Sequence, residues 1–273
     1  MGTFIQWKNF EALLPYANMF KEGLITTVLL ALFTVLIGFV LGLLLSVMRM
    51  SNIRPFLWLA HAFPDTFGFF ERDRNGMLRD SGFLYHLGRF NPLSFLATAY
   101  VEVIRSTPVL VQVMVIYFGV FSQLFSLPSF KIFGFIAFNR FFPGVVALAM
   151  NSGAYLCEII RSGLQSVEGG QTEAARSLGL SQLQNMRFII LPQALKNILP
   201  AIANEFVPII KESAITYTIG VQDIMAMVQA IKSATYIIME PLLVATALYF
   251  CLCFPLSKLI AYIERRMSRG DRR

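Results

Sequence analysis

The uncharged stretch from Gly23 to Met48 is the feature that most constrains how this chain can fold. A helix of that length crosses the roughly 30 Å hydrocarbon core of a bilayer. The stretch is too long for a signal peptide, and no convincing cleavage site follows it. Ser106–Phe130, Phe141–Cys157 and Tyr236–Tyr262 are further long apolar segments. The pattern therefore predicts an all-α protein that crosses a membrane several times.

Composition supports the membrane assignment and excludes several other classes. Hydrophobic residues make up 56% of the 273 residues and charged residues only 14%, and the mean hydropathy is +0.63. Soluble domains average about 25% charged residues, so this chain has too few for a soluble enzyme. The net charge of +7 is attributed to basic residues at the membrane faces, and no stretch suggests an RNA-binding surface, so nucleic acid is not an expected partner. Three cysteines within apolar runs give no disulfide framework.

A fourth apolar segment, 197–219, carries charges and prolines. Glu205, Lys211 and Glu212 would lie at membrane depth, where charges usually face a bundle interior or an aqueous path. Pro208 removes a helical hydrogen bond, so a kink or break is expected there. The following stretch, 220–235, is predicted to be an interfacial amphipathic helix outside the membrane.

Five spans place the two termini on opposite sides of the membrane. With the C-terminus inside, the inner segments hold 16 Lys and Arg residues and the outer segments hold 5. The positive-inside rule therefore places the N-terminus outside and the C-terminus in the cytoplasm. The expected organisation is an external segment 1–23, one transmembrane domain 24–267 and a basic tail 268–273 that meets membrane lipid.

The cytoplasmic segment 162–195 is too long and too regular to be a simple connection. Gln171–Leu178 favours a helix, and Gly179 suits the left-handed position after it. Ser181 with Gln184 predicts a capping box for a second helix, which Leu191-Pro192 is expected to end. A lone amphipathic helix on the membrane surface is the simpler interpretation of this segment.

The same segment resembles the EAA loop of ABC-importer permeases. The pattern E-A-A-x3-G-x9-I-x-L-P is complete, and its members are Glu173, Ala174, Ala175, Gly179, Ile189, Leu191 and Pro192. Further stretches, at 100–112, 151–161, 165–171 and 211–213, are similar to the polar amino acid uptake subfamily. The resemblance implies the five-span type I importer permease fold in a bacterial inner membrane.

The resemblance also implies partners. ABC ATPase subunits would dock on the loop and hold ATP and Mg²⁺, so this chain would bind no cofactor and catalyse nothing itself. A second permease subunit, identical or related, would complete the path. An extracytoplasmic binding protein would deliver an amino acid.

One segment departs from the subfamily pattern. The connection between the first two spans is usually short, whereas this chain has an aromatic and arginine-rich insertion at about 55–92. A turn at Asn75-Gly76 is expected within it. The insertion lies on the cytoplasmic side in this topology, against the membrane or the ATPase.

Polar side chains in the spans are the candidates for a substrate path. Glu205 and Lys211 offer an anion and a cation for a zwitterionic amino acid, and Asn151 and Ser152 offer hydrogen bonds. An internal Glu205–Lys211 ion pair is the structural alternative, and Glu212 and Ser213 are either substrate contacts or helix caps. Spacings of three residues predict ion pairs along one helix, and the pairs are Glu102 with Arg105 and Glu158 with Arg161.

The sequence contains no motif for ATP binding, catalysis or metal binding. The chain has no Walker A loop, so it is not expected to bind ATP itself. It has no H-E-x-x-H, and neither His61 nor His86 lies in a span, so an intramembrane protease or other enzyme is not expected, and no metal site is predicted. Gly38-x-x-x-Gly42 indicates close helix packing. A stand-alone carrier or channel is the alternative function, and an ABC permease for another small solute is a third.

Overall fold

The computed structural model describes residues 7–51 and 90–268 and is almost entirely helical. A two-residue antiparallel ladder is the only sheet among these residues. The α-helices are α1 (Trp7–Glu11), α2 (Ala17–Met50), α5 (Pro92–Arg105), α6 (Val109–Met114), α7 (Ser122–Leu124), α8 (Phe138–Gln165), α9 (Gly169–Ser177), α10 (Gln182–Asn185), α11 (Leu191–Glu212), α12 (Ile224–Thr235) and α13 (Met239–Ser268). The two strands are β1 (Lys131–Ile132) and β2 (Ile136–Ala137). Two segments, η1 (Leu14–Tyr16) and η4 (Ser213–Ile219), are 3-10 helices, and two others, η2 (Val115–Phe121) and η3 (Met186–Ile190), are π-helices.

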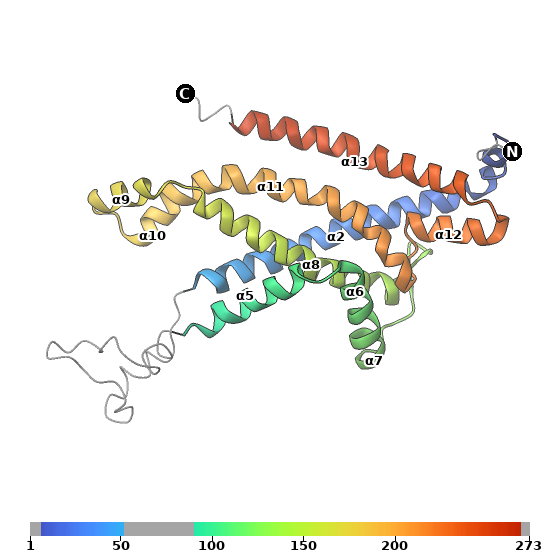
Figure 1. Ribbon diagram of the computed structural model, residues 1–273, viewed down its shortest axis with the longest axis horizontal. Helices are drawn as coiled ribbons and strands as arrows, with labels where there is room; N and C mark the ends of the chain where they lie inside the picture. The colour runs from blue at the N-terminus through green and yellow to red at the C-terminus, as the bar shows by residue number, and fades with distance from the viewer. Residues whose placement is uncertain (1–6, 52–89, 269–273) are drawn as a thin grey trace.

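Three helices are long and apolar enough to cross a membrane, and two bent pairs raise the number to five. The three lie within Trp7–Met50, Phe138–Gln165 and Met239–Met267. The bent pairs are Pro92–Arg105 with Val109–Leu124, and Gln182–Ile219 with Ile224–Thr235. The long helices run roughly along one another (Figure 1), as expected for a bundle of membrane spans.

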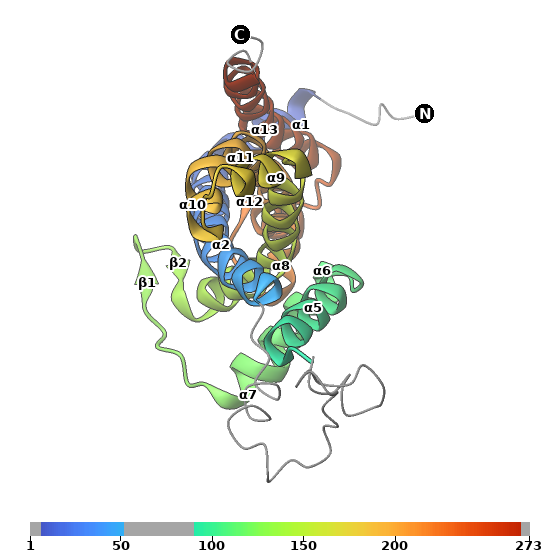
Figure 2. The same ribbon diagram turned by 90° about the vertical axis from the view of Figure 1, so that its left-hand side faces the viewer.

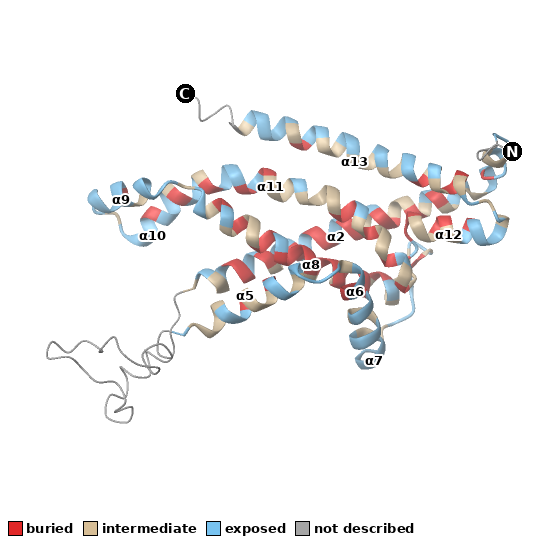
Figure 3. Cartoon of the chain, viewed as in Figure 1, coloured by how far each residue is buried: buried red, intermediate tan, exposed pale blue. Residues whose placement is uncertain are grey.

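The α2–α8 contact forms the centre of the bundle, where the ribbons lie side by side and most residues are buried (Figure 3). A Cβ on Gly38 would lie 2.9 Å from the Ser152 hydroxyl oxygen, so no larger residue fits without movement. Gly153 is equally close to Leu41 on the other helix. Small residues let the two backbones approach closely, as the G-x-x-x-G pattern predicted.

The second span differs from its sequence prediction. The helix α5 begins at Pro92 and ends at Arg105, and the chain bends by 110° before continuing from Val109 to Leu124. Pro108 disfavours helical backbone in the residue before it, which explains why α5 cannot run on. Gln112 stabilises the bend because its amide nitrogen donates to the carbonyl oxygens of Ile104 at 2.7 Å and Thr107 at 3.0 Å. The chain from α7 to the β1–β2 hairpin therefore stands out from the side of the bundle (Figure 2).

The fourth span also differs from its sequence prediction, at Pro208 and at Leu191-Pro192. The helix α11 continues through Pro200 and Pro208 to Glu212, so Pro208 does not break it. The alternative, a kink at Pro208, stays a prediction. Leu191-Pro192 begins α11 instead of ending the preceding helix, because the π-helical turn η3 leads directly into it. Packing of α11 against α8, α13 and α2 holds the helix together despite its two internal prolines.

The segment after α11 is where the fourth span changes direction. The helix tightens into η4, and Gly220 takes a left-handed conformation with φ of +84°. Asp223 then caps α12, because its carboxylate accepts a hydrogen bond from the Ala226 amide at 2.8 Å. The predicted helix in 220–235 is confirmed, and its apolar face packs on α2 and α13. Its predicted position outside the membrane stays a prediction.

The helix α13 lies on the outside of the bundle, against α11 and α12 (Figure 1). Most of its surface is exposed in the single chain, including large apolar side chains such as Phe250 and Tyr262. Exposed apolar surface of this extent is suited to lipid or to another membrane subunit. The turn at Asn75-Gly76, most of the 55–92 insertion and all but one residue of the 268–273 tail lie outside the described residues.

We expect Gly42→Ala to destabilise the protein by about 1–3 kcal/mol, the usual cost of overpacking a close contact. The added Cβ would lie 2.8 Å from the Leu156 Cβ and 3.0 Å from the Gly153 carbonyl oxygen, so α2 and α8 must separate. Gly119→Ala is the control, because its nearest neighbour would be 4.0 Å away. Thermal unfolding in mild detergent measures the difference. Equal midpoints for the two variants would contradict the close-packing argument.

Candidate functional site

The loop between α8 and α11 projects from one end of the bundle (Figure 1). The helix α9 carries the E-A-A residues, and Gly179 follows it with φ of +78°. The Leu180 amide donates to the Ala175 carbonyl at 3.1 Å, and the Gly179 amide donates to the Arg176 carbonyl at 2.9 Å. These bonds close the end of α9 and turn the chain back, as the sequence predicted.

The second helix of the loop starts with the predicted capping box. The Gln184 amide donates to the Ser181 hydroxyl at 3.3 Å, and the Ser181 amide donates to the Gln184 side-chain oxygen at 2.9 Å. Ala175 is buried between the two helices, whereas Glu173 lies on the exposed side. The loop is therefore a pair of short hydrogen-bonded helices joined by a tight turn.

The tip of this loop presents apolar side chains with nothing covering them in the single chain. Leu178 is 81% exposed and Leu183 is 78% exposed, on either side of the Gly179 turn. Glu173 and Arg176, on the adjoining helix α9, are exposed charged residues. An exposed apolar tip with a charged rim is typical of a surface that meets another protein.

The polar candidates on α8 lie inside the bundle. Asn151 is 6% exposed and Ser152 is 3% exposed, and the Ser152 hydroxyl faces Gly38 on α2. The substrate-path prediction for these two residues is untested, but in this conformation both are buried, and Ser152 lies at the α2–α8 contact.

The polar candidates on α11 are more accessible. Glu205 and Glu212 are half-buried, Lys211 is exposed, and Ser213 is buried with its hydroxyl donating to the Ile210 carbonyl at 2.7 Å. Because α11 is continuous here, seven residues bring Glu205 and Glu212 onto one face, whereas Lys211 lies about 120° around the helix from Glu205.

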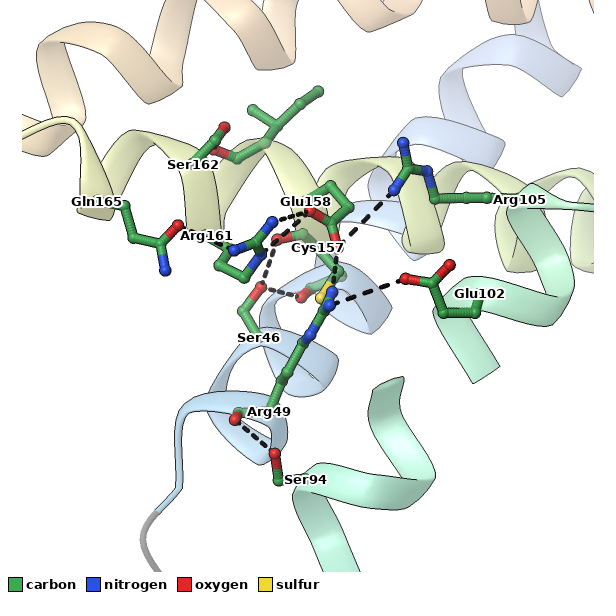
Figure 4. A network of polar contacts seen from close by, with 12 residues as sticks. Ser46, Arg49, Ser94, Glu102, Arg105, Cys157, Glu158, Arg161, Ser162 and Gln165 are labelled. Atoms are coloured by element: carbon green, nitrogen blue, oxygen red, sulfur yellow. Dashed lines mark hydrogen bonds and ion pairs between the residues drawn. The ribbon is translucent and has the colours of Figure 1, made fainter. Parts of the chain in front are cut away.

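A group of charged residues joins α2, α5 and α8 (Figure 4). The Glu158 carboxylate contacts Arg49 of α2, and it lies 3.8 Å from Arg105 of α5 and 2.7 Å from Arg161 of its own helix. Glu102 lies 4.0 Å from Arg49. The predicted Glu158–Arg161 pair is confirmed.

The predicted pairing of Glu102 with Arg105 is wrong, because each of these residues has its ion pair on a neighbouring helix. Arg49 was not among the residues predicted from the sequence. Its position at the end of an apolar span was the only available signal, because residues that pair between helices are not separated by any fixed number of positions in the sequence. Within the described residues, no group of three or more His, Cys, Asp and Glu side chains is arranged to hold a metal ion.

Comparison with known proteins extends these observations. Residues 81–269 match the family described as binding-protein-dependent transport system inner membrane component. The arginine transport system permease protein ArtQ of Bacillus subtilis is 34% identical over 263 residues, covering 96% of this chain and 99% of ArtQ. The nopaline transport system permease protein NocM of Agrobacterium fabrum is 34% identical, covering 88% of this chain and 83% of NocM.

Solved structures give the same result. The structure of an amino acid ABC transporter with histidines contains a chain that is 38% identical, with a TM-score of 0.74, over 94% of this chain and 98% of that one. The MetNI methionine ABC transporter in an inward-facing conformation shares the fold, with a TM-score of 0.62 at 18% identity, over 93% of this chain and 98% of its own. The chain therefore belongs to the inner membrane components of binding-protein-dependent transport systems, and it is a multi-pass permease with the type I ABC importer fold.

Proposed function

We propose that this chain forms the membrane path of an ATP-driven importer of amino acids and that its α9–α10 loop receives the ATPase subunits. The ordered helix–Gly179–helix projection, with its exposed apolar tip, is the observation that carries the proposal. Relatives named for arginine, glutamine and nopaline transport support an amino acid or a related compound as the cargo.

The loop is suited to transmitting force. The helix α9 follows α8 after only Ser166–Glu168, and α10 leads through η3 directly into α11. A push on the tip therefore reaches two spans through short, hydrogen-bonded connections. Partner ATPase subunits would hold ATP and Mg²⁺, and their closure would move these loops. Two permease subunits, identical or related, would enclose the path, and a binding protein would deliver substrate from outside.

The α11 surface is our proposed substrate contact. Glu205 and Glu212 share one half-buried face, which suits the ammonium group and any further cation of a substrate. Lys211, on the neighbouring face, is placed to attract the substrate carboxylate. Among the described residues, Glu205 and Lys211 do not form an ion pair with each other. Neither side chain therefore has to leave the other before it can contact a substrate.

Gly179→Arg should abolish co-purification of the ATPase subunits and ATP-dependent uptake while the spans stay folded. Arginine would strain the left-handed backbone and place a bulky charge between Leu178 and Leu183. Gly134→Arg is a matched control, because Gly134 has φ of +80° and, like Gly179, has no atom within 4 Å of an added Cβ. Pull-down of the tagged chain from native membranes measures docking. Normal ATPase binding and uptake by Gly179→Arg would overturn the docking proposal.

Lys211→Ala should raise the transport KM at least tenfold while the ATPase subunits stay bound, because a hydrogen bond to a charged group contributes about 1.5–3 kcal/mol. Lys232→Ala, which removes an exposed lysine from α12, is the matched control and should transport normally. Uptake of labelled amino acids into proteoliposomes gives KM and kcat for each variant. An unchanged KM for Lys211→Ala would show that Lys211 does not contact the substrate.

A further inference from the structure

An apolar groove lies between α2, α8 and α11, next to the π-helical segment η3. Its volume is about 490 Å³, and all but two of the side chains that line it are apolar. Ile160 of α8 and Ile198 of α11 are buried and form its floor. Leu43 and Val47 of α2 and Leu199 of α11 are exposed and form its rim. The described part of the chain therefore leaves the groove open along one side.

The two polar side chains of the groove are already hydrogen-bonded within the chain. The Ser46 hydroxyl donates to the Gly42 carbonyl oxygen at 2.7 Å, and the Ser51 hydroxyl donates to the Met48 carbonyl oxygen at 2.8 Å. A polar ligand would lose its water here and find no uncommitted side-chain donor in exchange, which is costly. The lining therefore suits a hydrocarbon and does not suit an amino acid.

The dimensions of the groove favour a slender occupant. The lining residues extend along α2 from Phe39 to Ser51 and along α11 from Leu191 to Ile202. At 1.5 Å per residue both walls are about 17–18 Å long, close to the roughly 15 Å depth of one bilayer leaflet. The mean cross-section is then about 30 Å², whereas a helix about 10 Å in diameter needs roughly 80 Å². An acyl chain fits this space, and a helix of a second copy does not.

A positive charge lies at one end of the groove. Ser51 and Met186 line the groove at the end of the bundle from which the α9–α10 loop projects (Figure 1). Arg187 directly follows Met186 and is exposed, with its guanidinium 5.5 Å from the centre of the Phe188 ring. Arg187 takes part in none of the ion pairs formed within the described residues. Arginine binds phosphate oxygens through paired hydrogen bonds, and basic residues beside clefts between spans attract anionic headgroups.

We propose that this groove binds one anionic phospholipid, with an acyl chain between α2 and α11 and the phosphate group against Arg187. The lipid fills the space beside η3, which connects the α9–α10 loop to α11. Binding of a lipid here requires only that the chain spans a membrane, so it is independent of the cargo and of the ATPase subunits.

A single tryptophan on the rim tests the proposal. Trp7→Phe and Trp58→Phe remove the two natural tryptophans, and Val47→Trp places a reporter on a side chain that is 63% exposed, outside the packed core. The purified transporter is reconstituted in phosphatidylcholine vesicles that contain a minor fraction of brominated lipid, which quenches tryptophan on contact. Brominated phosphatidylglycerol should associate with this reporter about fivefold more strongly than brominated phosphatidylcholine, the factor expected for one basic residue near an anionic headgroup.

A second reporter measures the general attraction of the basic protein for anionic lipid. Phe250→Trp, in the same background, lies on the exposed apolar face of α13 and should be quenched equally by the two brominated lipids. Arg187→Gln should remove the preference of the Val47→Trp reporter for phosphatidylglycerol. Arg265→Gln is the matched control, because it removes another exposed arginine near the same end of the bundle, and should leave the preference unchanged (Figure 1).

Filling the groove separates a seated acyl chain from a lipid that is attracted by Arg187 alone. Leu43→Phe combined with Leu195→Phe adds a ring to each wall at exposed positions, and it should also remove the preference. A preference that survives this filling, or survives Arg187→Gln, would overturn the proposal. Equal preferences at Val47→Trp and Phe250→Trp would also overturn it, because the groove would then hold ordinary bilayer lipid. A Val47→Trp reporter that neither lipid quenches would overturn it by showing that another protein surface covers the groove.

Discussion

The close approach of α2 and α8 is the contact on which the rest of this structure depends. Lipid tails are as apolar as the side chains of a span, so hydrophobicity alone does not hold two spans together. Glycines at 38, 42 and 153 remove the side chains that would separate the backbones, and dispersion contacts then act over the length of both helices. Other spans are arranged around this pair, with α5 and α11 packing on both of its members.

Buried polar groups occur at bends, at helix ends and between helices, where apolar packing alone would leave backbone atoms or charges without a partner. Gln112 supplies donors to the carbonyls left open by the bend after α5, and Asp223 supplies an acceptor at the start of α12. The Glu158 group joins α2, α5 and α8 just before the chain leaves the bundle to form the α9–α10 loop. Each group satisfies charges or backbone atoms that an apolar surrounding would otherwise leave unpaired.

Local patterns predicted local structure well. The Gly179 turn and the Ser181 capping box involve residues within a few positions of each other, so their geometry follows from residue type and spacing. The effect of each proline was predicted less well, because whether a proline interrupts a helix depends on the helices that pack around it. Pro108 accompanies a bend of 110°, whereas Pro208 lies within a continuous helix held by packing on three sides. The same residue type gave opposite results in different surroundings.

The sequence by itself determined that the chain is helical and membrane-spanning, because the length and hydrophobicity of a span are properties of consecutive residues. It also determined the helix–turn–helix loop between α8 and α11, whose complete motif lies within twenty consecutive residues. Only the tertiary structure decided which charges meet. Arg49 and Glu158 are 109 positions apart, and Glu102 and Arg105 find partners on neighbouring helices despite their favourable spacing. The reason is physical: ion pairs between helices depend on how the helices are rotated and packed, and that arrangement is fixed by contacts along the whole bundle.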